Sequence, residues 1–271
     1  MSRLLRNQLR VGLTPDRLFL AGRRRGFHRT ADRSEMMMVE AAKDPGDWQP
    51  AVEALPSAIA LSELHRPEVT VVLSNHFVRY ALLPANDALK RDDEWLALAR
   101  HRLAAVHGAA AGNWAVRVSA AKGGGERIVS AADAALIDAV RTRVAECGAK
   151  LASAQPNLMT TFNALRKDIG EQSCWLVIKE TGRLTLALIE KGTWRAVRSR
   201  RMDDGWRTPL REILERECAV LALDQPYTRS VLVLNEDFAV NGREALHVPD
   251  WTGEDEFEAG APDAAMAHAA R

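Results

Sequence analysis

The sequence predicts an α/β fold, because short β-rich runs alternate with amphipathic helical patterns along most of its 271 residues. Two segments, residues 9–40 and 173–201, each contain a hairpin with a third strand, so they are alike in kind. Between them the predicted elements follow the order β-α-β-β-α-β. The chain is 47% hydrophobic and 27% charged, which is the composition of a globular protein with a sizeable core.

The first segment opens with a hairpin. Two apolar runs, residues 9–13 and 18–21, flank the turn "TPDR", in which Pro15 and Asp16 occupy turn-favouring positions. The run "SEMMMVEAA" is expected to continue it as a third strand. Residues 46–65 predict one or two helices with a break near Pro56. The β-branched run "EVTVVLSN" then predicts a strand.

The middle segment, residues 77–155, has the element order of a ferredoxin-like βαββαβ unit. Strands are expected at 77–83, 114–118, 127–131 and 150–156, and helices at 92–106 and 132–147. Gly108 and Gly148 follow the two helices, where glycine commonly ends a helix. If the unit is compact, one small core should contain Val78, Leu98, Val116, Ile128 and Val140.

The last segment begins with a helix that Pro156 opens. Residues 175–201 read as three strands joined by the tight turns "ETGR" and "EKGT". An amphipathic helix over 205–218, a short buried strand "RSVLVLN" and an edge strand "REALHVP" are expected next. Residues 250–271 carry six acidic residues against Arg271 and predict a disordered tail.

The charge and the cysteine content restrict the classes of function that the protein can have. The net charge of +1 gives no argument for nucleic-acid binding, although residues 1–33 carry nine arginines against Asp16 and Asp32. That basic stretch is interpreted as a solvated face, with docking to an acidic partner or an anionic membrane as the alternative. The three cysteines are widely spaced and predict neither a zinc site nor disulfides. Without a signal peptide or a membrane-spanning run, a cytoplasmic protein is expected.

The paired hairpins resemble those of the actin-like ATPases, in which the turn of a hairpin in each half faces a nucleotide phosphate. The junction "GAKLASAQPNLMTTFNAL", followed by "CWLVIKETGRLTLALIEKGTWRAVRSRRM", is similar to that of the PilM-, FtsA- and GspL-like members. The resemblance implies an actin-like (ribonuclease H-like) fold with a truncated second half. The expected parts are a first-half subdomain at 1–76, an inserted ferredoxin-like subdomain at 77–155, a second-half subdomain at 156–249 and the tail at 250–271.

The hairpins depart from the family at the positions that serve phosphate and metal. Gly12 stands where the family has an acid, and Thr14 where it has a glycine. In the second hairpin no Asp occurs between residues 173 and 190, and the turn region contains Lys179, Glu180, Gly182 and Arg183. A magnesium nucleotide requires carboxylates for the metal and open backbone N–H groups for phosphate. We therefore expect degenerate hairpins, no cofactor, no metal and no catalysis.

The resemblance implies a cytoplasmic adaptor at the inner face of the inner membrane, beneath a type IV pilus or type II secretion machine. Its expected partner is the cytoplasmic tail of an inner-membrane protein, through which alone it would meet the membrane; a homo-oligomer is left open. The groove implied by the resemblance would be lined here by Val72, Phe77, Val78, Tyr80, Leu96 and Arg100. Alternatively, the apolar members only pack the sheet.

Two other functions remain open at the level of the sequence. An actin-like ATPase or sugar-kinase-like enzyme with an unusual site would be stabilised by nucleotide. A self-assembling structural protein would form filaments without a membrane partner.

Overall fold

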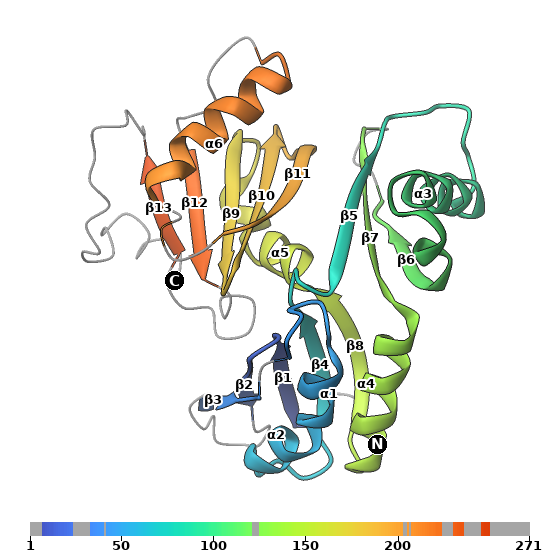
Figure 1. The fold of residues 1–271 in the computed structure, drawn as a ribbon, viewed down its shortest axis with the longest axis vertical. Helices are drawn as coiled ribbons and strands as arrows, with labels where there is room; N and C mark the ends of the chain where they lie inside the picture. The colour runs from blue at the N-terminus through green and yellow to red at the C-terminus, as the bar shows by residue number, and fades with distance from the viewer. Residues whose placement is uncertain are drawn as a thin grey trace.

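The computed structural model describes residues 7–23, 33–40, 42–120, 125–202, 205, 207–223, 230–235 and 245–249. The described strands form three sheets. In Figure 1 the first lies at the bottom, the second at the upper left and the third at the upper right, with helix α5 (Asn157–Ile169) between them. The predicted acidic tail at 250–271 falls outside the described residues.

The first sheet has the strand order β3-β2-β1-β4-β8. Its strands are β1 (Gln8–Leu13), β2 (Arg17–Arg23), β3 (Arg33–Met38), β4 (Glu68–Leu73) and β8 (Lys150–Pro156). Strand β1 pairs antiparallel with β2 and parallel with β4, and β4 pairs parallel with β8. Helices α1 (Gln49–Glu53), α2 (Leu55–Leu61) and α4 (Ala134–Glu146) pack on this sheet and complete its core. The predicted helix break near Pro56 is confirmed.

The second sheet has the order β11-β10-β9-β12-β13 and is covered on both faces. Its strands are β9 (Cys174–Glu180), β10 (Arg183–Glu190), β11 (Thr193–Arg201), β12 (Ser230–Asn235) and β13 (Ala245–Pro249). Alternate residues of β9 face opposite sides: Leu176 packs with α5, and Val177 packs with α6 (Arg207–Val220). The continuous apolar run "WLVI" is thus explained by burial on both faces, and the three predicted strands of this segment are confirmed.

The third sheet has the order β5-β7-β6. It is built from β5 (Val78–Leu83), β6 (Trp114–Val118) and β7 (Arg127–Asp133), with α3 (Asp92–His107) and the short helix η2 (Gly108–Asn113) inserted between β5 and β6. One face packs against Trp95, Ala99 and Leu103 of α3. The other face contributes Ile128 to the core around α5. An ion pair between Arg195 and Glu126, at 3.2 Å, also joins this sheet to β11.

The predicted βαββαβ unit is wrong in its last two elements. Strand β8 pairs with β4 in the first sheet, and α4 packs on the same sheet. The five residues expected in one core lie in three different ones: Val78 and Val140 in the first-sheet core, Ile128 in the α5 core, and Val116 with Leu98 in the α3 core. The physical reason is that β4 is apolar, lies in the middle of a sheet and needs a neighbour on each side. The inserted unit therefore ends at β7.

Candidate functional site

The tips of the two hairpins meet between the halves of the molecule. Pro15 and Asp16 form the tip of β1–β2, and Thr181 and Gly182 form the tip of β9–β10. Arg17 donates a hydrogen bond to the Thr181 hydroxyl at 3.1 Å. The second tip is also held from the loop after β4, because Nε2 of His76 lies 2.9 Å from the Thr181 carbonyl oxygen.

Glu180 is the centre of this junction. Glu180 is only 2% exposed, and its two carboxylate oxygens accept a hydrogen bond from the Asn75 backbone N–H, at 3.0 and 3.2 Å. Oε1 also accepts from Asn157 Nδ2 at 3.3 Å. Burial raises the pKa of Glu180, while the hydrogen bonds from these partners oppose the rise. A carboxylate of the second half is thereby fixed to the end of β4 and the start of α5.

Asn75 extends the network into the third sheet. Its Oδ1 accepts from the Tyr80 hydroxyl at 2.6 Å and from the Leu158 backbone N–H at 3.4 Å. Burial raises the pKa of Tyr80, and the nearby charge of Glu180 acts in the same direction. Tyr80 therefore remains a neutral donor. We call this network the inter-half cluster; it comprises Thr14, Asp16, Arg17, Asn75, His76, Tyr80, Asn157, Glu180, Thr181 and Arg183.

Basic groups surround the second tip. Arg183 donates to the Ser199 hydroxyl at 2.9 Å, and burial together with the neighbouring Arg79 lowers its pKa. Burial, and then the charge of Arg183, lower the pKa of His76 to about 4, so His76 is neutral at pH 7. Asp16 is bound by Arg17 at 2.5 Å; despite the opposing effect of burial, that arginine lowers the pKa of Asp16.

The predicted phosphate positions are occupied by contacts within the protein. Gly12 pairs with Phe19 inside the β1–β2 ladder, and the buried Thr14 hydroxyl donates to Asp16 at 3.0 Å. In the second hairpin Lys179 is half-buried, and Gly182 adopts φ 71° at the tip. Within the described residues, no cluster of three or more His, Cys, Asp or Glu side chains is arranged to hold a metal ion. The contacts of the two hairpin tips instead join the two halves of the molecule.

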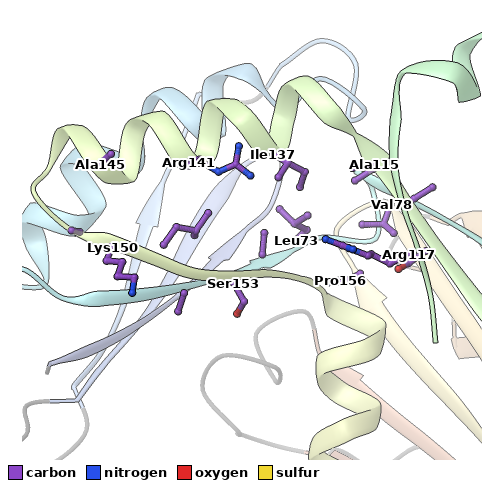
Figure 2. Close-up of a pocket in the computed structure, with 17 residues that line it drawn as sticks. Leu73, Val78, Ala115, Arg117, Ile137, Arg141, Ala145, Lys150, Ser153 and Pro156 are labelled. Carbon is purple, nitrogen blue, oxygen red and sulfur yellow. The ribbon is translucent and has the colours of Figure 1, made fainter. Parts of the chain in front are cut away.

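A cavity of about 630 Å³ lies elsewhere, between the first and third sheets. Figure 2 shows α4 on one side of it and β8 on the other, with Val78, Ala115 and Arg117 at the end formed by the third sheet. Five consecutive residues of β8, 150–154, line the cavity. Because successive side chains of a strand point to opposite faces, a cavity lined by a continuous run faces the strand's edge.

The cavity wall combines small and basic side chains. Seven of its 17 lining residues are alanine, and none is Asp or Glu. The basic residues are Arg117 from β6, Arg141 from α4 and Lys150 from β8. Arg141 forms an ion pair with Asp138 at 2.5 Å. Sequence reasoning missed this cavity, because nothing local in "KLASAQP" indicates which sheet the strand joins or which edge stays open.

The six predicted partner residues do not form one surface. Val72 and Phe77 are buried in different cores, and Val78 is buried but contributes to the cavity wall. The other three are also separated. Tyr80 belongs to the inter-half cluster, Leu96 packs in the α3 core, and Arg100 is exposed on α3. The six residues thus belong to different cores and walls, and of them only Val78 also lines the cavity. A partner groove lined by these residues stays a prediction.

No family model matches the sequence, and no curated protein sequence matches it. Solved structures do match. The PilM–PilN type IV pilus biogenesis complex aligns over 89% of this chain and 84% of its own, at 14% identity and a TM-score of 0.61. A Bacteroides thetaiotaomicron protein of unknown function with an actin-like ATPase fold aligns over 90% of this chain and 100% of its own, at 12% identity and 0.52.

A third match is the cytoplasmic domain of EpsL, an inner-membrane component of the type II secretion system of Vibrio cholerae. It covers 75% of this chain and 74% of its own, at 12% identity and a TM-score of 0.49. The first two alignments show that the chain has an actin-like ATPase fold, which confirms the fold class predicted from the hairpins. Among the described helices, none has the length and apolar character needed to cross a membrane.

Proposed function

We propose that this protein is a non-catalytic cytoplasmic adaptor that binds the cytoplasmic tail of an inner-membrane component of a pilus or secretion system. The observation that carries the proposal is the cavity between the first and third sheets, which exposes the edge of β8. An exposed strand edge offers a row of backbone donors and acceptors to an extended segment of another chain. The adaptor would reach the inner face of the membrane only through this partner.

The hairpins support the non-catalytic part of the proposal. Phosphoryl transfer needs carboxylates that hold metal ions and a positioned nucleophile. Asp16 is paired with Arg17, and Glu180 is buried under hydrogen bonds from Asn75 and Asn157. Both carboxylates thus stabilise the contact between the halves. The similarity in fold to PilM, whose structure was solved as a complex with PilN, supports a role in partner binding.

The proposal is tested by recovery of the partner from the source cell. The tagged full chain is expressed there, cross-linked, and its membrane-bound partners are identified by mass spectrometry. Ala152→Trp places a bulky side chain at the exposed β8 residue in the cavity wall, and Ala104→Trp makes the same change at an exposed site on α3. We expect an inner-membrane protein with a short cytoplasmic tail to be recovered with the Ala104→Trp variant and lost with Ala152→Trp.

The identified tail, as a synthetic peptide, should bind the purified protein directly. Equal melting temperatures of the two variants are the control for folding. The proposal fails if the recovered partner has no cytoplasmic tail, or if Ala152→Trp retains it as well as Ala104→Trp does.

A further inference from the structure

The cavity presents one open strand edge on its long side. Strand β8 pairs with β4, and no other described strand pairs with it; β6 is likewise paired only with β7 within the described residues. Residues 150–154 all line the cavity, which gives an open edge about 16 Å long at the usual rise of a strand. An edge of this length accommodates an added strand of about five residues.

Small side chains leave room for a backbone along this edge. Alanines come from every wall: Ala152 and Ala154 from β8, Ala145 from α4, and Ala115 from β6. A wall of methyl groups allows the main chain of an occupant to approach β8 closely. It also leaves shallow apolar space near Ile137 for alternate side chains of that occupant.

The charge of the wall determines which segment fits. The side chains of Arg117 and Lys150 form no ion pair or hydrogen bond in the part of the chain that the structure describes, whereas Arg141 has Asp138 as its partner. Figure 2 shows Arg117 reaching from β6 toward the space between α4 and β8, and Lys150 lies at the start of β8. The two uncompensated cations are thus contributed by two different walls. An occupant with carboxylates would neutralise both, and one with lysines would be repelled.

We propose that the cavity binds an acidic extended segment of a partner protein, which adds to β8 as a strand and pairs its carboxylates with Arg117 and Lys150. The location of the partner in this cavity rests on the function proposed above. The strand addition and the acidic character rest on the β8 edge and on the two cations. Backbone hydrogen bonds to β8 contribute affinity, and the charges select the segment.

The test is a selection from a random eight-residue peptide library on the purified full chain. Peptides that bind are expected to be enriched in Asp and Glu. A selected peptide should bind about tenfold more weakly to Arg117→Glu or Lys150→Glu, since each change replaces an attraction by a repulsion. Arg100→Glu, at the exposed site on α3, is the matched control and should bind as the unchanged protein does. Raising the salt concentration should weaken binding to the unchanged chain.

Strand addition has its own readout. In an extended peptide, successive amides point to opposite sides, so N-methylation of alternate residues blocks one side at a time. One set of methyl groups should reduce affinity about tenfold, and the complementary set should have little effect. Equal effects of both sets would contradict addition to β8.

Several results would overturn the proposal. It fails if the library yields no binders, if the binders are neutral or basic, or if acidic binders are insensitive to both charge reversals. It also fails if acidic peptides bind only after removal of residues 250–271, because the chain's own tail would then be the occupant. If a membrane partner is recovered from cells but the library yields neutral peptides, the acidic-segment proposal is contradicted and the adaptor function is not. Acidic binders without a membrane partner would instead remove the adaptor function.

Discussion

The two five-stranded sheets have the same topology in their first four strands and differ in the fifth. Each contains a hairpin with a third strand, and the first strand of each hairpin pairs in parallel with a later strand: β1 with β4, and β9 with β12. The fifth strand differs. Strand β8 is parallel to β4 and arrives after the third sheet and α4, whereas β13 is antiparallel to β12. Within the described residues, only the first arrangement places another sheet beside the fifth strand, and the cavity lies there.

The hairpin tips differ in a similarly specific way. Thr14 and Arg17 flank the first tip, and Glu180 and Arg183 flank the second at equivalent positions. Thr14 bonds within its own hairpin, whereas Glu180 bonds across the halves. Two similar turns therefore have unequal roles: Glu180 and Thr181 of the second tip accept hydrogen bonds from Arg17, Asn75 and His76 of the first half.

The largest expected effect comes from Glu180→Ala. This change leaves the buried Asn75 N–H and the Asn157 amide without their acceptor, and we expect the free energy of unfolding to fall by about 3 kcal/mol. Thr14→Ala, at the equivalent position of the first hairpin, removes only a local bond and should cost about 1 kcal/mol. Urea unfolding of both variants measures the difference. Equal losses would show that the two tips are equivalent after all.

The second effect is a pH dependence caused by His76. Its pKa of about 4 in the folded protein lies below the ordinary 6.5, so the unfolded chain binds more protons between these values. Stability should fall as the pH is lowered through this window, by at most about 1.4 kcal/mol per pH unit. Glu180 acts oppositely, since its raised pKa gives a contribution that is present at low pH and lost as the pH rises through the folded value.

His76→Gln tests this assignment, because it removes only the histidine contribution. Between pH 7 and 4.5 the variant should lose less stability than the unchanged protein in urea unfolding at each pH. His101→Gln, an exposed site on α3, is the control and should follow the unchanged protein. Parallel pH profiles for all three proteins would exclude His76 as the source.

A smaller effect is expected at the second tip itself. Gly182 has φ 71°, and an added Cβ would meet nothing within 4 Å, so Gly182→Ala should cost about 1 kcal/mol from backbone conformation alone. Gly112, which is equally open but has no positive φ, is the matched control. Thermal unfolding of both alanine variants distinguishes them. A loss at Gly112 as large as that at Gly182 would point to a cause other than φ.

The smallest expected effect is that of Mg-ATP on the unchanged protein. A ligand present at a hundred times its dissociation constant stabilises the native state by about 2.7 kcal/mol. Because Asp16 and Glu180 are committed to protein contacts, we expect no change in the melting temperature at millimolar Mg-ATP. An upward shift that Arg183→Ala abolishes would restore the enzyme alternative.

The sequence predicts local features, such as turns and helix starts, better than it predicts which strands pair with one another. The turn at Gly182 and the start of α5 after Pro156 follow from short-range rules and are confirmed. The pairing of β8 was misassigned, because sheet membership depends on residues far away in the chain. The apolar run of β4 was the available signal, since such a strand needs two neighbours. Nothing local shows that Glu180 is buried, because a glutamate beside a tight turn is ordinarily exposed.

The parallel pairing of β8 with β4 has a consequence for the order of folding. The chain between these strands, residues 74–149, includes the whole third sheet, so the pairing must close a long loop. In the meander β9-β10-β11, two-residue turns connect strands that follow one another in the chain, so their pairing closes only short loops. Since local contacts form faster than distant ones, pulse-labelled hydrogen exchange during refolding should protect amides of β10 before those of β8. The edge of β8 that lines the cavity would then be among the last parts of the molecule to form, after the β9–β10 hairpin of the second sheet.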